Sequence, residues 1–204
     1  MKSQLLTSPQ PTTKRIADLN GPDFYPTPSW ATHVLLDSEK FSGNVWECAC
    51  GDGEMSDAIA SHGYNVESSD LFDRGYGDAG VDFLKSDKTA DNIITNPPFH
   101  SAEEFVAAAR EKATKKYAFL LRLAFLESAN RQKTIFLDNP PSKIWVFSER
   151  ITFYPRGAVR KGSGTTAYAW FVWDQENDGP TELSWLPTGY KSGSKSKPSS
   201  GLLL

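Results

Sequence analysis

Asn96, Pro97, Pro98 and Phe99 form a short loop directly after a β-branched run at residues 91–95. Two prolines fix φ and remove two backbone N–H donors, so the loop presents carbonyl oxygens. Asn96 adds a side-chain carbonyl, and Phe99 adds an aromatic face on which a flat ring can stack. These groups suit the binding of a planar amine or amide. A rigid turn closed by a buried aromatic side chain is the alternative interpretation.

A second Asn-Pro-Pro occurs at Asn139-Pro140-Pro141, where Ser142 follows instead of an aromatic residue. It lies between a predicted helix and a predicted strand, and therefore at the opposite edge of the expected sheet. Prolines are common just past helix ends. We interpret this copy as a structural turn.

Gly51 and Gly53 follow another predicted strand. Without Cβ atoms they allow a tight turn and a close approach to a ligand, beside the free amides of the next helix. Asp70, 17 residues after Gly53, ends the next strand and can accept hydrogen bonds from ribose hydroxyls. The pattern G-x-G-x-x-G is absent, and the acidic Glu54 disfavours a pyrophosphate. Gly51, Gly53 and Asp70 together predict a nucleoside-containing cofactor without phosphates. A purely structural glycine turn is the alternative interpretation.

Alternating strands and helices must position these loops. The pattern predicts strands over residues 44–49, 64–68, 81–84, 91–95, 117–123, 143–147 and 166–173. Helices are expected over residues 54–62 and 126–137, and from Ser101, which with Glu104 has the spacing of a capping box. Residues 117–123 are nearly all apolar, as in a central strand covered on both faces. The alternation predicts an α/β fold with a doubly wound sheet, whose ligands bind beyond the carboxyl ends of the strands.

The chain of 204 residues fits one domain with additional segments. We expect a flexible leader over residues 1–20, a domain over residues 21–176, and an extension over residues 177–204 that is flexible from about residue 190. No apolar run approaches the ~20 residues of a membrane span, and no secretion signal is recognisable, so a cytoplasmic protein without a membrane partner is expected. Cys48 and Cys50 are expected to be reduced thiols, and no metal-ligand cluster is visible.

Charge is divided unevenly along the chain. Residues 1–109 hold 7 Lys/Arg against 17 Asp/Glu, whereas residues 110–161 hold 12 against 4. A basic section on an acidic protein favours contact with phosphates, with a solvated basic surface as the alternative. Basic residues interleaved with aromatics could grip a nucleic-acid backbone and flank an extruded base. The candidate DNA-binding residues are Lys115, Lys116, Phe153, Tyr154, Arg156, Arg160 and Lys161.

The Asn96 loop and its companions resemble the motifs of S-adenosylmethionine-dependent N6-adenine DNA methyltransferases. Residues 23–28, Asp-Phe-Tyr-Pro-Thr-Pro, are similar to that family's N-terminal cofactor motif, and residues 47–53 are similar to its glycine loop. Asp70 matches the ribose-binding acid, and Asp82 with Phe83 resembles the adenine-holding segment. The motif order is that of the γ arrangement. Over residues 23–173 the pattern looks most like small members often encoded by phages.

This resemblance implies a Rossmann-like class I fold, with a mostly parallel sheet and an antiparallel last strand, in which residues 21–176 are the catalytic domain. It implies S-adenosylmethionine as cofactor and DNA as partner. The implied catalytic residues are Asn96, Pro97, Pro98 and Phe99. The implied cofactor-binding residues are Tyr25, Thr27, Pro28, Glu47, Ala49, Gly51, Gly53, Asp70, Asp82 and Phe83.

The implied reaction transfers a methyl group directly to N6 of an adenine turned out of the DNA stack. A separate target-recognition domain is not evident, which leaves sequence specificity open. RNA adenine and a protein glutamine amide are alternative acceptors, because both present a planar nitrogen. A nonenzymatic DNA-binding or inhibitory protein that keeps the fold is the alternative of another class.

Overall fold

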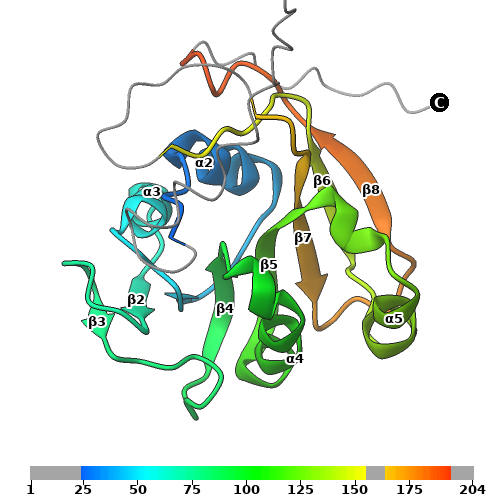
Figure 1. Cartoon of the computed structure of the whole chain (residues 1–204), viewed down its shortest axis with the longest axis horizontal. Coiled ribbons are helices and arrows are strands. Elements are labelled where there is room, and N and C mark those ends of the chain that lie inside the picture. Colours follow the sequence, from blue (N-terminus) through cyan, green and yellow to red (C-terminus); the bar gives the residue numbers. More distant parts are fainter. Residues whose placement is uncertain (1–23, 155–163, 194–204) are drawn as a thin grey trace, which may run out of the picture.

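The computed structural model describes residues 24–154 and 164–193. They form one sheet with the strand order β3-β2-β1-β4-β5-β7-β6-β8 (Figure 1). The strands are β1 (Val45–Glu47), β2 (Val66–Asp70), β3 (Asp78–Ala79), β4 (Ala90–Thr95), β5 (Ala113–Arg122), β6 (Lys143–Phe147), β7 (Tyr168–Asp174) and β8 (Glu182–Leu186). β7 is antiparallel to β5 and β6, and the other neighbouring strands are parallel. The predicted α/β fold, mostly parallel with an antiparallel strand late in the chain, is confirmed.

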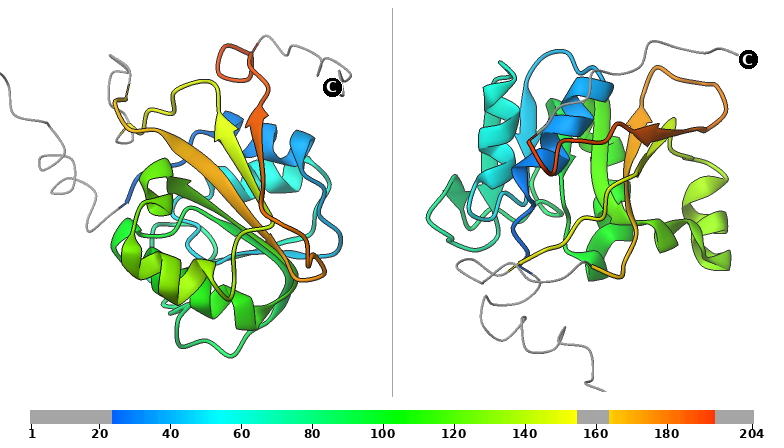
Figure 2. Two further views of the ribbon diagram at one scale, coloured as in Figure 1. Left: turned by 90° about the vertical axis from the view of Figure 1, so that its right-hand side faces the viewer. Right: turned by 90° about the horizontal axis from the view of Figure 1, so that it is seen from above.

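Helices cover both faces of the sheet (Figure 2). α2 (Ser29–Ser38) and α3 (Glu54–Ser61) pack on one face, and α4 (Ala102–Lys112) packs on the other. Three short turns, η1 (Phe99–Ser101), η2 (Leu123–Leu126) and η3 (Gln132–Phe136), and the one-turn α5 (Ala129–Arg131) complete the described helical segments. None of these helices has the length and apolar character needed to cross a bilayer.

Successive side chains of the central strands point to opposite faces of the sheet, and this explains why the core has two sides. In β5, Phe119 and Leu121 face the α4 side, whereas Leu120 faces α2 and α3. In β7, Phe171 and Trp170 repeat the same alternation. All five side chains are at most 1% exposed. A strand buried on both faces is apolar at every position, which is why its sequence predicts a central strand.

Three predicted elements differ in the structure. The strand expected over residues 81–84 is a turn, because the Asp82 carboxylate accepts a hydrogen bond from the Leu84 amide at 3.1 Å, and β3 forms before it instead. Ser101 makes no side-chain capping bond, since the turn η1 precedes α4. The helix expected over residues 126–137 is divided, because Ser128 breaks it and caps α5.

Besides β3, two longer elements, α2 and β8, have no counterpart in the sequence prediction. α2 begins after Pro28, whose carbonyl accepts a hydrogen bond from the Ala31 amide at 2.9 Å. β8 lies in the predicted extension and pairs parallel to β6, so the sheet continues past the boundary placed at residue 177. β8 is an edge strand with Leu183 and Trp185 exposed, and its sequence therefore lacks the apolar run of a central strand.

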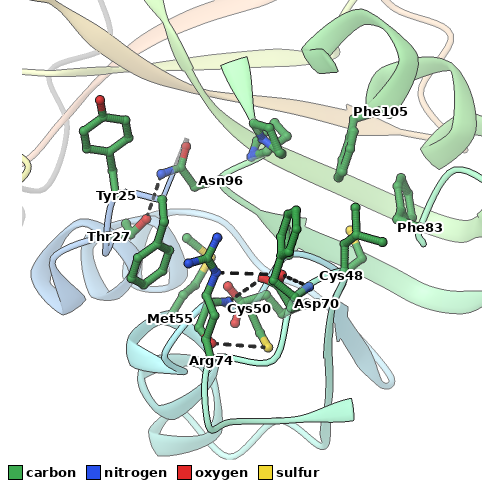
Figure 3. A pocket seen from close by; sticks show the side chains of 18 of the residues that line it. Tyr25, Thr27, Cys48, Cys50, Met55, Asp70, Arg74, Phe83, Asn96 and Phe105 are labelled. Atoms are coloured by element: carbon green, nitrogen blue, oxygen red, sulfur yellow. Dashed lines mark hydrogen bonds and ion pairs between the residues drawn. The ribbon is translucent and has the colours of Figure 1, made fainter. Parts of the chain in front are cut away.

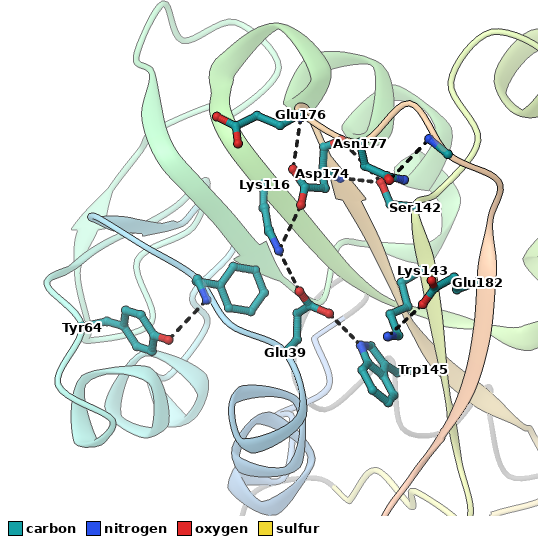
Figure 4. Close-up of polar contacts among 12 residues, drawn as sticks. Glu39, Tyr64, Lys116, Ser142, Lys143, Trp145, Asp174, Glu176, Asn177 and Glu182 are labelled. Atoms are coloured by element: carbon teal, nitrogen blue, oxygen red, sulfur yellow. Dashed lines mark hydrogen bonds and ion pairs between the residues drawn. The ribbon is translucent and has the colours of Figure 1, made fainter. Parts of the chain in front are cut away.

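A polar network fastens the sheet to the end of α2 (Figure 4). Lys116 Nζ lies 2.8 Å from Glu39 Oε1 and 3.1 Å from Asp174 Oδ2. Glu39 also accepts a hydrogen bond from Trp145 Nε1 at 3.1 Å. Burial disfavours the charged form of Lys116, but its hydrogen bonds to Glu39 and Asp174 prevail and raise its pKa. One lysine thus joins α2 to β5 and β7 and, through Glu39, to β6.

We expect Lys116→Met to lower the free energy of unfolding by about 1–3 kcal/mol, because two partly buried carboxylates would lose their shared cation. Urea unfolding monitored by circular dichroism measures this loss. The exposed Lys133→Met is the control, and its change should stay within about 0.5 kcal/mol. Equal stabilities for the two variants would contradict a structural role for Lys116.

Candidate active site

A cavity of about 320 Å³ opens at the carboxyl ends of β1, β2 and β4 (Figure 3). This is the size of an ordinary small-molecule site, which spans about 300–1,000 Å³. Most of the predicted catalytic and cofactor residues line it together, although they come from separate segments of the chain. They are Tyr25, Thr27, Glu47, Ala49, Gly51, Asp70, Asp82, Phe83, Asn96, Pro97, Pro98 and Phe99.

Pro28 and Gly53 are not part of the cavity lining. Pro28 is the N-cap of α2, and Gly53 is the N-cap of α3. Gly53 has φ +87°, and a Cβ there would lie 2.3 Å from the Tyr76 ring. Both residues shape the backbone that carries the site, and neither faces the cavity.

Asp70 and the glycine loop hold one another in place. The Gly51 amide donates to Asp70 Oδ2 at 2.9 Å, and the Phe72 amide donates to Asp70 Oδ1 at 2.8 Å. A Cβ on Gly51 would lie 2.4 Å from the Phe24 ring, so glycine allows the segment before α2 to pack on the loop. The carboxylate of Asp70 is therefore fixed at the cavity wall before any ligand arrives.

Glu47 is a buried acid in the cavity wall, 2% exposed. The pKa of its carboxyl is raised to about 8, chiefly by burial and to a smaller extent by the charges of Asp70 and Asp52, while the hydrogen bond from Ser56 opposes the shift. The Ser56 hydroxyl also lies 2.6 Å from the Ser68 hydroxyl. Glu47 is thus largely protonated at neutral pH, and a cation in the cavity would favour its ionised form.

The far end of the cavity is aromatic. Phe83 is 2% exposed, and its ring centroid lies 5.2 Å from that of Trp46 and 4.8 Å from that of Phe105. Asp82 beside it pairs with Lys85 Nζ at 2.8 Å, a hydrogen bond that lowers the pKa of the Asp82 carboxyl. A flat ring fits this apolar wall with a carboxylate at its edge.

Asn96 is oriented by a residue far away in the sequence. Its Nδ2 donates to the buried Thr27 hydroxyl at 3.0 Å. Its Oδ1 is buried without a hydrogen-bond partner among the described residues. Figure 3 shows Asn96 and Thr27 joined at one end of the cavity. Because a buried acceptor without a partner costs free energy, a donor that reached Oδ1 would stabilise this arrangement.

Phe99 belongs to a cluster of aromatic rings. Its centroid lies 6.4 Å from that of Tyr25 in a stacked arrangement and 6.0 Å from that of Tyr168. Phe153 packs against both tyrosines, at 6.3 Å and 5.0 Å. The Arg122 guanidinium lies 4.6 Å from the Phe99 centroid. The sequence analysis missed Tyr168 and Arg122, and the only signal for them was their position at the ends of two predicted strands.

Cys48 and Cys50 are free thiols in the wall of this cavity. Burial raises the pKa of Cys48 well above its ordinary value and that of Cys50 to about 12. Neither side chain is a thiolate at neutral pH. Both act as apolar lining, since nucleophilic attack needs the thiolate.

The predicted DNA-binding residues are divided by the structure. Lys115 lies toward the amino end of β5, where it donates to the Ser42 carbonyl at 3.2 Å and pairs with Asp91 at 3.5 Å. Lys115 and Lys116 thus lie toward the sheet edge opposite the cavity, held in other contacts. Phe153 packs on Tyr25 and Tyr168, the two tyrosines that also contact Phe99, and Tyr154 follows it. Arg156, Arg160 and Lys161 lie outside the described residues.

The second Asn-Pro-Pro has different partners. Asn139 Nδ2 donates to the Tyr117 hydroxyl at 2.7 Å, and the Asn139 carbonyl accepts from Trp173 Nε1 at 2.9 Å. It precedes β6, away from the cavity lining. The tripeptide therefore has a structural role here.

Several solved structures with a similar fold are named as methyltransferases. A candidate class I S-adenosylmethionine-dependent methyltransferase from Listeria monocytogenes has a TM-score of 0.55 at 13% identity, over 78% of this chain and 65% of that one. The EcoKI M protein of a type I restriction enzyme has a TM-score of 0.54 at 14% identity, over 74% of this chain and 44% of that one. A predicted O-methyltransferase from Agrobacterium tumefaciens has a TM-score of 0.50 at 11% identity, over 78% and 84%. The chain has the class I methyltransferase fold.

No protein-family model and no curated sequence matches the chain. The chain spans 65% of the Listeria protein and 44% of the EcoKI protein. Identities of 11% to 14% establish a shared fold. Cofactor and acceptor must therefore be inferred from the residues of the cavity.

Glu47→Gln should change how stability depends on pH. With its raised pKa, folded Glu47 keeps a proton that the unfolded chain releases above its ordinary pKa near 4.5. This stabilisation is complete below pH 4.5 and is lost as the pH rises to about 8. Between pH 5 and 8 the free energy of unfolding of the wild type should fall, relative to that of the variant, by up to about 1.4 kcal/mol per pH unit. Urea unfolding at several pH values measures the difference, and parallel curves would contradict the assignment.

Proposed function

We propose that this protein transfers a methyl group from S-adenosylmethionine to the exocyclic N6 of adenine in DNA. The observation that carries the proposal is the buried Oδ1 of Asn96, an acceptor without a described partner at the rim of a nucleoside-sized cavity. The fold shared with class I methyltransferases supports the same reaction class.

The cavity fits the proposed cofactor. Asp70 offers carboxylate oxygens to ribose hydroxyls, and Phe83 with Asp82 offers a wall and an acceptor for an adenine. Asp52 and Glu54 also line the cavity, so its charge favours a cationic ligand over a phosphate. When bound, S-adenosylmethionine supplies an electrophilic methyl group on a sulfonium.

The chain's own residues act on the acceptor amine. The Pro98 carbonyl is engaged by the Ser101 amide at 3.0 Å, which leaves the Pro97 carbonyl and Asn96 Oδ1 as the proposed acceptors. Accepting both amino hydrogens would draw the nitrogen lone pair out of ring conjugation and aim it toward the cavity. Phe99 would stack on the extruded base and return about 1–3 kcal/mol of the cost of unstacking it.

DNA is favoured as the source of the adenine for two reasons. Residues 110–161 hold 12 Lys/Arg against 4 Asp/Glu, and Arg122 lies directly on the Phe99 ring. The EcoKI M protein, whose fold this chain shares, is part of a type I restriction enzyme. RNA adenine and a protein glutamine amide offer the same kind of nitrogen, so the assay compares all three acceptors. A nonenzymatic role predicts no turnover on any of them.

Asn96→Ala should reduce methyl incorporation into adenine-containing DNA by about 100-fold or more, since one of two groups that orient the amine is lost. Phe99→Ala should reduce it by about 10- to 100-fold through lost stacking. Transfer of a radiolabelled methyl group from S-adenosylmethionine measures both rates, and calorimetry measures cofactor binding, which should change little.

Asn139→Ala is a matched control, because it alters the other Asn-Pro-Pro without touching the cavity. It should lower stability and leave the turnover of the folded protein unchanged. Full turnover by both Asn96→Ala and Phe99→Ala, with cofactor affinity intact, would refute the proposed catalytic roles. Methylation of RNA or glutamine instead of DNA would refute the acceptor alone.

Arg160→Ala and Lys161→Ala should each weaken DNA binding, because each loses one phosphate contact. In each variant the slope of the logarithm of the binding constant against the logarithm of the salt concentration should become shallower by about 1. Fluorescence anisotropy with a labelled duplex at several salt concentrations measures the slope. Lys115→Ala, toward the opposite edge of the sheet, should leave it unchanged. An unchanged slope in the first two variants would exclude them from the interface.

A further inference from the structure

Arg122 is the last residue of β5 and lies outside the cavity lining, over the ring of Phe99. Its Cζ is 4.6 Å from the Phe99 centroid, whereas Phe99 itself lines the cavity. Tyr168, the first residue of β7, is the cross-strand partner of Arg122. The Leu123 amide donates to the Ala167 carbonyl at 2.9 Å, so the ladder continues past Arg122. Arg122 is thus presented from a rigid strand end, next to the ring on which the proposed acceptor stacks.

Tyr168 gives the Arg122 guanidinium a second contact. Burial raises the pKa of the Tyr168 hydroxyl, and the charge of Arg122 and a hydrogen bond from it oppose that rise. Tyr168 is 8% exposed, and its ring centroid lies 6.0 Å from that of Phe99 and 5.0 Å from that of Phe153. An arginine that stacks on one ring and donates to a packed tyrosine loses less conformational entropy when it binds an anion.

Several other cations of the basic section, residues 110–161, already pair with carboxylates. They are Lys115 with Asp91, Lys116 with Glu39 and Asp174, Arg131 with Glu103, and Lys143 with Glu182. The described contacts of Arg122 are with a ring face and a neutral hydroxyl, and neither cancels a positive charge. Because Arg122 is also exposed, its charge is accessible to an anionic ligand.

The cavity itself would repel a phosphate. Asp52, Glu54 and Asp70 line it, and like charges at short range raise the free energy of a bound anion. When a base is turned out of a nucleic acid, the phosphates on either side of it stay joined to its sugar. For a base stacked on Phe99, these phosphates must therefore remain outside the cavity, on the side where Arg122 lies over the ring.

We propose that Arg122 binds a backbone phosphate flanking the adenine that stacks on Phe99, and that the Tyr168 hydroxyl positions the guanidinium for this contact. The inference rests on the proposed function and deepens it, because it assigns a phosphodiester as a second recognised group. A guanidinium offers two parallel donors that match two phosphate oxygens. A glutamine amide in a protein has no phosphate beside it, so this contact selects a nucleic acid as the acceptor.

The test uses DNA duplexes that differ in one charge. Each carries a single site that the wild type methylates, and one of the two phosphates flanking the target adenine is replaced by an uncharged methylphosphonate. Fluorescence anisotropy measures the affinity of each duplex. At one of the two positions, we expect the replacement to weaken binding to the wild type by about 10-fold and binding to Arg122→Met by less than about 2-fold.

Two further variants separate charge from positioning. Arg122→Lys should give an intermediate ratio of the two affinities, because lysine keeps the charge without the parallel donors. Tyr168→Phe should also give an intermediate ratio, since the guanidinium loses its acceptor while the aromatic packing stays. An unchanged ratio in Tyr168→Phe would refute the positioning role of that hydroxyl.

Equal losses in the wild type and in Arg122→Met would overturn the proposal, because another group would then hold the phosphate. No loss in the wild type at either position would overturn it as well. If Arg122→Met does not fold, Arg122→Gln decides the question, since it removes the same charge from an exposed position. Lys133→Met, an exposed lysine outside the cavity lining, is the matched charge control and should keep the wild-type ratio. Failure of the wild type to bind or methylate any duplex would instead overturn the proposed acceptor.

Discussion

The hydrogen bond between the Asn96 amide and the Thr27 hydroxyl is the interaction on which the candidate site depends. It joins the Asn96 loop after β4 to the segment before α2, 69 residues away in the sequence. Because Nδ2 is engaged, Oδ1 is left as a buried acceptor without a partner among the described residues, and prolines next to Asn96 and Thr27 keep the two segments rigid. A preorganised acceptor of this kind can bind a donor without reorganisation of the loop.

Electrostatics divide the molecule into two functional regions. The cavity combines a buried Glu47 whose pKa is raised to about 8, a fixed Asp70, and an Arg74 that stacks on Phe24. Outside the cavity, the cationic Arg122 lies over the Phe99 ring of the Asn96 loop. A net charge of −3 for the whole chain conceals this division.

The antiparallel strand β7 brings side chains of two strands to the Phe99 ring. Its register places Tyr168 opposite Arg122 at the end of β5, and both side chains then reach Phe99. The same strand carries Trp173, which donates to the second Asn-Pro-Pro at the other edge of the sheet. One Asn-Pro-Pro thus follows the carboxyl end of β4 at the cavity, whereas the other precedes the amino end of β6 at the opposite side of the sheet.

The sequence by itself determined the α/β class, the central strand β5, the bounds of β6 and the loops that meet at the cavity, because periodicity and proline or glycine chemistry are local properties. Only the tertiary structure decided which cationic side chains lie at the cavity and beside the Asn96 loop. Lys116 pairs with Asp174, 58 positions away, whereas Arg74 and Arg122 stack on aromatic rings of the site. The partners of a long side chain are chosen by packing between distant segments, and no local pattern encodes that choice.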